Sequence, residues 1–285
     1  MTEATVTSFG EDEPLPELYR SGRRKRARSQ RSRLLAYAVG MAVIVAVALT
    51  ADWQTIGAKY FDATRAREQF PDIVTIAAKN TLIYTVFSFL GGVLLGLSAA
   101  LLRLSSIRVY RWVAAVYIEI FRGLPALLTI IFVGFLAPIA LKFQYPELVG
   151  VPTGGIAALS LVAGAYLAET IRAGIEAVPK GQVEASRSLG MTHVQTLRSI
   201  VVPQAFRVVI PPLTNELVLL LKDTALLAAL GVTITSKELT QFGRDASNTG
   251  YNGTPLVVAG AMYLMITIPL TRLVGVLERR NKRSQ

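Results

Sequence analysis

The chain has 285 residues, of which 52% are hydrophobic and 17% are charged, and its mean hydropathy is +0.45. Soluble domains carry about 25% charged residues, so this composition is typical of an integral membrane protein. The sequence has no cysteine and a single histidine, His193, which excludes disulfides and cysteine nucleophiles, and no metal site is expected.

The net charge of +11 is concentrated near the N-terminus. Eight basic residues lie between Arg20 and Arg33, and this run ends where the first apolar block begins. The positive-inside rule predicts such a run on the cytoplasmic side of a membrane helix, so we expect the lipid bilayer as its partner and no nucleic acid. Residues 1 to 19 are acidic and poor in apolar side chains, and they are predicted to be disordered.

Residues 34 to 52 are predicted to form an N-terminal transmembrane helix. The apolar stretch from Leu34 to Ala51 is longer than the roughly 7 to 15 apolar residues of a signal peptide. A cleavable signal is the alternative, because Ala46-Val47-Ala48 has the small-x-small form of a cleavage site. In both cases the segment that follows begins outside the cell.

Five further apolar stretches are long enough to cross a bilayer, which takes about 20 helical residues. Their predicted bounds are about Ile76 to Leu102, Leu124 to Leu141, Gly154 to Ile171, Phe206 to Leu230 and Pro255 to Leu277. The sequence therefore predicts an all-α integral membrane protein with six transmembrane helices.

The segment from Arg111 to Arg122 precedes the second of these five stretches and has a different pattern. It places Trp112, Val116 and Ile120 on one helical face, which is typical of a helix lying at the membrane interface. Gly123-Leu124-Pro125 then predicts a change of chain direction.

The distribution of lysine and arginine predicts the orientation. With both termini inside, the cytoplasmic segments hold 21 Lys and Arg residues and the external segments hold 6. The opposite orientation would reverse this bias and contradict the positive-inside rule. Both termini are therefore expected in the cytoplasm, including a basic tail at residues 278 to 285.

A polar stretch at about residues 173 to 205 connects the fourth and fifth predicted spans on the cytoplasmic side. Its apolar residues recur at helical spacing on either side of Gly190, which predicts two short helices joined at a glycine turn. Pro203 is predicted to end the second helix. Such a hairpin has the shape of a plug for a cleft on another protein.

The residues of this stretch resemble the EAA loop of ATP-binding cassette (ABC) importer permeases, E-A-A-x3-G-x9-I-x-L-P. The matching residues are Glu184, Ala185, Ser186, Gly190, Ile200 and Pro203, with Ser186 in place of the second alanine and Val202 in place of leucine. The motifs Phe121-Arg122-Gly123-Leu124-Pro125, Tyr166 to Arg172, Pro179 to Gln182 and Lys222 to Leu226 are similar to the polar amino acid branch of these permeases.

The resemblance, which covers about residues 73 to 277, implies a five-helix type I permease core preceded by the additional N-terminal helix. It implies a pathway formed with a second permease subunit, identical or different, in a bacterial plasma membrane. An extracytoplasmic amino-acid-binding protein would deliver the substrate, with glutamate the first expectation and a basic amino acid the second. The EAA loop would dock on a separate ATPase subunit.

The sequence lacks the G-x-x-x-x-G-K-[ST] motif that cradles nucleotide phosphates. Its nearest imitation is Gly91 to Ser98, where Leu97 replaces the lysine. We therefore expect no enzymatic activity and no cofactor on this subunit, with ATP and Mg²⁺ bound by the partner ATPase. Gly92-x-x-x-Gly96 instead predicts close helix packing.

Ionisable and polar residues within predicted spans are costly and usually face a partner or an aqueous pathway. The candidates for the substrate pathway are Asn80, Tyr84, Thr85, Asn215, Glu216, Lys222 and Asp223. Glu169 and Arg172 are predicted to form a structural ion pair. By themselves, such residues are also compatible with a secondary transporter or a channel, the alternative to an ABC permease.

Overall fold

The computed structural model describes residues 17–231 and 234–282, and the chain divides into two units, residues 1–56 and 57–285. The first unit contains helix α1 (Glu17–Thr50), whose stretch Ser32–Thr50 has a mean hydropathy of 2.0. This stretch matches the predicted N-terminal transmembrane helix. The segment predicted to be disordered overlaps α1 by three residues, and residues 1–16 lie outside the described residues.

The second unit is helical apart from one small β-hairpin. After α2 (Trp53–Tyr60), which begins in the first unit, its elements are α3 (Ala63–Glu68), α4 (Lys79–Leu104), α5 (Arg108–Gly123), α6 (Ala126–Ile131), α7 (Ala137–Leu141), β1 (Glu147–Leu148), β2 (Val151–Pro152), α8 (Thr153–Glu176), α9 (Lys180–Ser188), α10 (His193–Thr196), α11 (Val202–Asp223), α12 (Leu239–Gly250) and α13 (Thr254–Lys282). Wider π-helical turns precede α4, α7 and α11, at Ile73–Ala78, Phe132–Leu136 and Leu197–Val201.

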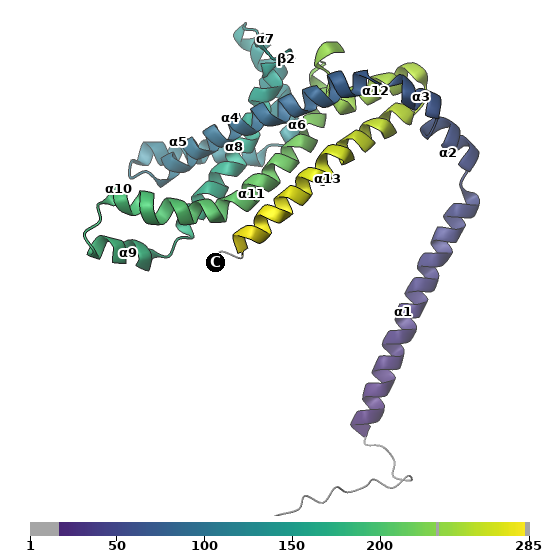
Figure 1. Cartoon of the computed structure of the whole chain (residues 1–285), viewed down its shortest axis with the longest axis horizontal. Coiled ribbons are helices and arrows are strands. Elements are labelled where there is room, and N and C mark those ends of the chain that lie inside the picture. The colour runs from purple at the N-terminus through teal and green to yellow at the C-terminus, as the bar shows by residue number, and fades with distance from the viewer. Residues whose placement is uncertain (1–16, 232–233, 283–285) are drawn as a thin grey trace, which may run out of the picture. The chain divides into compact units, whose positions relative to one another are not determined.

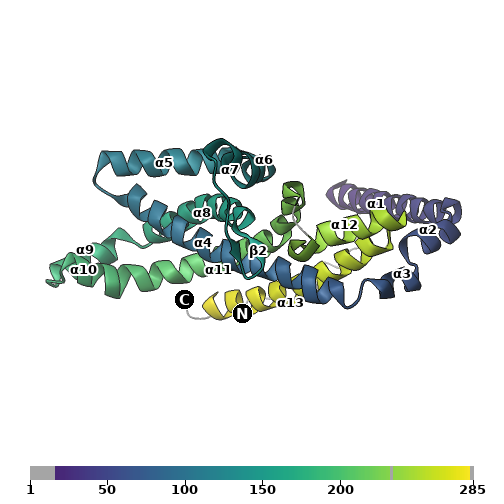
Figure 2. The ribbon, with the colours of Figure 1, turned by 90° about the horizontal axis from the view of Figure 1, so that it is seen from above.

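The centre of this unit is the pair α4 and α8, against which α5 and α11 pack (Figures 1 and 2). Glycines allow the two central helices to approach closely. A Cβ atom at Gly92 would lie 2.9 Å from the Ala163 Cβ, and one at Gly96 would lie 2.8 Å from the Leu167 Cβ. Real Cβ atoms do not come this close, so these positions exclude a larger residue. The close packing predicted for Gly92-x-x-x-Gly96 is thus confirmed.

The chain turns sharply where Gly123-Leu124-Pro125 predicts it. Helix α5 ends at Gly123, Pro125 precedes α6, and the axis changes direction by 111° between α5 and the run from α6 to α7. Helix α5 buries Ala114 and Ile118, while Trp112 on another face is 68% exposed. This amphipathic pattern agrees with the predicted interfacial helix.

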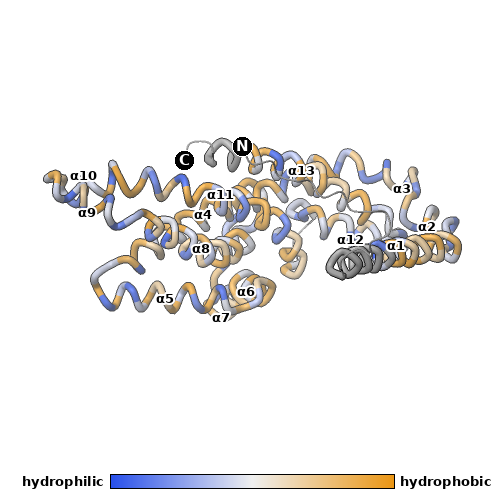
Figure 3. The backbone as a smooth tube through the Cα atoms, turned by 90° about the horizontal axis from the view of Figure 1, so that it is seen from below, coloured by the Kyte–Doolittle hydropathy of each residue, from blue (hydrophilic) through white to orange (hydrophobic). Residues whose placement is uncertain are grey.

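Within the described residues, four helical stretches are long and apolar enough to cross a membrane, and the bent pair α5 with α6–α7 makes a fifth if counted as one span. The four are Ser32–Thr50, Ile73–Leu104, Thr153–Glu176 and Thr254–Val276. The predicted span from Phe206 to Leu230 is not among them, because α11 carries several charged residues and gives way to a 3-10 helix at Thr224–Leu230. Figure 3 shows hydrophobic residues along α4, α8 and α13.

The prediction that Pro203 ends a helix is wrong. The chain is helical from His193 through Asp223, with the π-helical turn Leu197–Val201 joining α10 to α11. Pro203 lies in the first turn of α11, where a proline is tolerated because the early N–H groups of a helix have no partner within it. The π turn resets the hydrogen-bond register just before the proline.

Candidate functional site

The segment α9–α10 forms a helical hairpin with Gly190 at its turn. Gly190 has φ +83°, a left-handed conformation that glycine adopts without a steric penalty. The Gly190 N–H donates to the Arg187 carbonyl and the Met191 N–H donates to the Ser186 carbonyl. These two bonds form a Schellman motif that ends α9. The predicted turn between two short helices is therefore present.

The second helix of the hairpin begins with its own cap. The Thr192 hydroxyl accepts a hydrogen bond from the Gln195 N–H, and the Gln195 side chain accepts one from the Thr192 N–H at 2.8 Å. This reciprocal capping box satisfies two backbone donors at the start of α10. Both sides of the turn are thus fixed by local hydrogen bonds.

Ser186, which replaces alanine in the EAA pattern, joins the two helices. Its side chain is buried and its Oγ lies 2.8 Å from the Val183 carbonyl oxygen and 3.0 Å from the Thr196 Oγ1. The base of the hairpin packs on an apolar cluster that contains Val178, Val201 and Ala205. The hairpin is therefore anchored at its base and braced between its helices.

The tip of the hairpin leaves apolar side chains uncovered. Leu189 is 85% exposed and Val194 is 70% exposed. Glu184 is also exposed, and it lines an open cavity of about 650 Å³ beside α9 together with Lys180 and Leu197. An apolar tip on a braced hairpin has the chemistry of a contact surface for another protein.

The predicted pathway residues on α4 make hydrogen bonds within the chain. The Asn80 Nδ2 donates to the Thr235 carbonyl at 2.8 Å and to the Lys237 carbonyl at 3.0 Å. The Tyr84 hydroxyl donates to the Ser236 carbonyl at 3.4 Å, and the Thr85 hydroxyl donates to the Thr81 carbonyl. Asn80, Tyr84 and Thr85 are all buried. Asn80 and Tyr84 thus hold residues 235–237 against α4, whereas the Thr85 bond lies within α4.

The predicted pathway residues on α11 lie apart from that hydrogen-bond network. Asn215 and Lys222 are exposed on one face of the helix, whereas Glu216 and Asp223 on the neighbouring face are half-buried. No hydrogen bond joins these four residues to Asn80, Tyr84 or Thr85 within the described parts of the chain. The candidates thus form two separate groups, and in this subunit only the Asn215 and Lys222 face is open.

Glu169 and Arg172 lie within ion-pair distance. The Arg172 Nη2 is 2.7 Å from the Glu169 Oε2, and its Nη1 is 2.8 Å from the Glu176 Oε2. Glu176 is therefore a second carboxylate partner of Arg172, beyond the predicted pair.

Two further polar features were not predicted. Glu238 is fully buried at the start of α12, where its carboxylate accepts hydrogen bonds from the Thr240 and Gln241 N–H groups and, at 2.8 Å, from the Tyr263 hydroxyl. Burial raises the pKa of the Glu238 carboxyl. The signal that could have revealed it is an acidic residue directly before a helical pattern.

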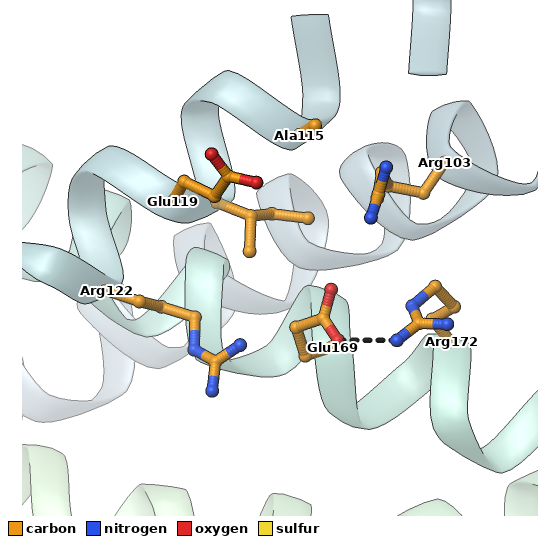
Figure 4. A pocket seen from close by; sticks show the side chains of 7 residues that line it. Arg103, Ala115, Glu119, Arg122, Glu169 and Arg172 are labelled. Atoms are coloured by element: carbon orange, nitrogen blue, oxygen red, sulfur yellow. Dashed lines mark hydrogen bonds and ion pairs between the residues drawn. The ribbon is translucent and has the colours of Figure 1, made fainter. Parts of the chain in front are cut away.

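The second feature is a cavity of about 330 Å³ between α4, α5 and α8 (Figure 4). Its lining includes Arg103, Glu119 and Arg122 in addition to the Glu169 and Arg172 pair. The described residues contain no cluster of three or more His, Cys, Asp or Glu side chains placed to hold a metal ion.

Comparisons with known proteins give one consistent family. Residues 92–283 match the family model described as "Binding-protein-dependent transport system inner membrane component". The chain is 36% identical over 214 residues to the L-cystine transport system permease protein TcyB of Bacillus subtilis (strain 168), an alignment that covers 75% of this chain and 88% of the relative.

Two other relatives carry different substrate names. The arginine transport system permease protein ArtQ of the same Bacillus strain is 35% identical, over 71% of this chain and 89% of its own length. The glutamate/aspartate import permease protein GltK of Escherichia coli O157:H7 is 33% identical, over 70% of this chain and 89% of its own length. Among solved structures, a crystal structure of an amino acid ABC transporter with histidines aligns with a TM-score of 0.69 and 34% identity, covering 77% of this chain and 98% of that chain.

Proposed function

The chain belongs to the family of binding-protein-dependent transport system inner membrane components and is a permease subunit of an ABC importer for amino acids, and from this premise we propose that the α9–α10 hairpin couples it to a separate ATPase subunit. Two such permease subunits form the pathway, and an extracytoplasmic binding protein delivers the amino acid. ATP and Mg²⁺ bind to the ATPase.

The observation that carries this proposal is the exposed apolar tip on a braced hairpin. Leu189 and Val194 are mostly uncovered by their own chain, while Ser186 and the caps of both helices brace the hairpin with hydrogen bonds. A braced hairpin would move as one body with the ATPase subunit and pass that movement on to the membrane helices, whereas a flexible loop would deform instead. Because removing apolar surface from water contributes roughly 25 cal/mol per Å², burial of the tip in an ATPase cleft would stabilise the complex.

Placing charged residues at the tip of the hairpin by substitution tests the proposal. The double variant Leu189→Asp with Val194→Asp should lose co-purification of the ATPase, since burying an unpaired carboxylate is costly. The matched control is Val149→Asp, which alters an apolar residue that is 57% exposed in the turn between β1 and β2, at the opposite end of α8. Retention of the ATPase by the double variant would contradict the proposal, provided that both variants reach the membrane in equal amounts.

For the transported substrate we propose a polar amino acid, with glutamate the first to test and a basic amino acid the second. Lys222 on the open face of α11 supports an interaction with a substrate carboxylate, because a cation offsets the cost of placing that anion in a low-dielectric pathway. Uptake of radiolabelled glutamate by the complete importer should be reduced by excess unlabelled glutamate. Inhibition by arginine or lysine alone would assign a basic amino acid instead.

A further inference from the structure

The cavity of about 330 Å³ between the C-terminal parts of α4, α5 and α8 is lined by charged side chains in addition to the Glu169 and Arg172 ion pair. Its charged lining consists of Arg103, Glu119, Arg122, Glu169 and Arg172. The cavity has room for a small polar ligand, and we call it the arginine cavity.

Only one of its three guanidinium groups has carboxylate partners at bonding distance. Arg172 binds Glu169 on one side and Glu176 on the other. Arg103 makes no hydrogen bond or ion pair with the described residues, and its Nε is buried without a hydrogen-bond partner. Arg122 lies over the Tyr166 ring, with its guanidinium carbon 5.4 Å from the ring centroid, and has no ion pair with the described residues. Two cationic groups thus face the cavity with their hydrogen-bond donors unused.

Glu119 supplies the complementary charge. Its side chain is exposed, and within the described residues it forms no ion pair or hydrogen bond. Figure 4 shows Glu119 and Arg122 reaching into the space from α5, opposite Arg103 from the end of α4. An anion alone would be attracted by the arginines and repelled by Glu119. A ligand with an anionic group and an ammonium group would satisfy all three side chains.

The position of the cavity matches the level of lipid headgroups. Arg103 and Arg172 lie near the C-terminal ends of two apolar helices that are long enough to cross a membrane. Helix α5 presents Trp112, Val109 and Val113 on its exposed apolar side, and tryptophan is enriched at the boundary between membrane and water. The α9–α10 hairpin follows directly on α8, so this boundary is the cytoplasmic one if the hairpin meets the ATPase as proposed above.

We propose that the arginine cavity binds a zwitterion, with its anionic group on Arg103 and Arg122 and its ammonium group on Glu119. The guanidinium groups donate charge-assisted hydrogen bonds to phosphate or carboxylate oxygens, and the Glu119 carboxylate accepts hydrogen bonds from the ammonium. The phosphoethanolamine headgroup of an inner-leaflet lipid carries this pair of charges at the level of the cavity. A free amino acid has the same two charges, so the two sources must be separated by experiment.

The test measures lipid binding to the purified full chain in detergent by native mass spectrometry. The probes are phosphatidylethanolamine, which is zwitterionic, and phosphatidylglycerol, which is only anionic. Arg103→Gln and Glu119→Gln should each weaken binding of phosphatidylethanolamine by about fivefold or more, the ratio that roughly 1 kcal/mol per charge near a membrane surface corresponds to. The control Arg108→Gln, an exposed arginine of α5 outside the cavity, should leave binding unchanged.

Glu119→Gln separates a zwitterion site from an anion site. If the cavity binds any anion, removing this carboxylate should strengthen phosphatidylglycerol binding and leave phosphatidylethanolamine no weaker, which would overturn the proposal. Equal binding by all variants would also overturn it. Because Glu119 is exposed, this variant should fold even if Arg103→Gln does not, and thermal unfolding in detergent checks both.

A competition arm identifies the source of the ligand. Displacement of bound phosphatidylethanolamine by millimolar L-glutamate or L-arginine would assign the cavity to a free amino acid, and no displacement would assign it to the lipid headgroup. Both results keep the zwitterion assignment. The measurement needs no ATPase, so failure of the proposed coupling function and failure of this inference give different results.

Discussion

Near the N-terminal end of α4 the buried polar side chains form hydrogen bonds within the chain, whereas Arg103 near its C-terminal end has no hydrogen-bond partner among the described residues. Asn80 and Thr81 hydrogen-bond to the backbone of Thr235, Lys237 and Leu239. Arg103, one residue from the other end of the helix, faces a cavity without an ion pair to the described residues. Buried polar groups are costly unless they are paired. Polar groups that bond to one another within the chain therefore indicate a role in folding, whereas polar groups without partners in the chain indicate a binding site for another molecule. Changes at the first end should therefore destabilise the subunit more than changes at the second end.

The largest expected effect is on Glu238, whose hydrogen bonds lie within the chain. Glu238→Ala removes the N-cap of α12 and leaves the Tyr263 hydroxyl without its carboxylate partner. The expected loss is roughly 3 kcal/mol of unfolding free energy, from one cap and one hydrogen bond to a carboxylate, while the Tyr263 hydroxyl keeps the Thr224 and Thr240 hydroxyls as partners. Thermal or denaturant unfolding in detergent measures it. A loss below about 1 kcal/mol would mean that the network is not structural.

The pH dependence of stability sharpens the same test. Burial raises the pKa of Glu238 in the folded chain, so the folded state favours the protonated carboxyl more than the unfolded state does. The stability that this shift contributes is therefore present below the ordinary glutamate pKa and is lost as the pH rises through the raised value. Glu238→Gln, which stays neutral, should remove this part of the pH dependence. An unchanged pH profile would contradict the assignment.

Asn80→Ala should have the next largest effect. The substitution removes two hydrogen bonds from the buried Asn80 amide to the Thr235 and Lys237 carbonyls, and each such bond contributes roughly 0.5 to 1.5 kcal/mol to stability. The matched control is Asn215→Ala, because Asn215 is exposed on α11 and should change stability little. Equal losses in the two variants would remove the distinction between buried, hydrogen-bonded polar groups and exposed ones.

Features fixed by the local backbone were predictable from the sequence. Gly190 and Gly123-Leu124-Pro125 predict a turn and a bend because glycine permits left-handed backbone angles and proline fixes φ, and both the turn and the bend are present. Pro203 shows the limit of such local arguments. A π-helical turn continues the helix up to this proline, and nothing in the neighbouring residues marks that turn.

Features that depend on distant contacts were not predictable. The polarity of Asn80 within an apolar span predicts a pathway residue, and no local pattern identifies its hydrogen-bond partners, which are more than 150 residues away in the chain. Likewise, Ser186 was a departure from a motif until Thr196 was found beside it. A single sequence gives the type of a polar residue, whereas its role depends on what the fold brings next to it.

Gly190→Val tests the α9–α10 hairpin and should cost less unfolding free energy than the Glu238→Ala substitution. No heavy atom lies within 4 Å of a Cβ at this position, so the penalty is the left-handed backbone alone, about 1 to 2 kcal/mol. We expect the subunit to remain in the membrane and to lose substrate-stimulated ATP hydrolysis by its complex. Gly181→Val, also without a neighbour within 4 Å but in an ordinary helical conformation, should retain stimulation. Gly190→Asn should restore it, because asparagine tolerates this conformation.

The smallest expected effect on folding is at Lys222. This side chain is exposed near the C-terminal end of α11 and has no ion pair with the described residues, so Lys222→Met should leave the unfolding transition within about 0.5 kcal/mol of the parent, as for most surface substitutions. If the ammonium attracts the substrate carboxylate, the KM for uptake should rise about tenfold, the ratio that corresponds to 1.4 kcal/mol. Lys79→Met makes the same chemical change at an exposed residue at the start of α4 and should leave the KM unchanged. An unchanged KM for Lys222→Met would place Lys222 outside the pathway. A large loss of folded protein would show instead that α11 needs this charge for its own packing.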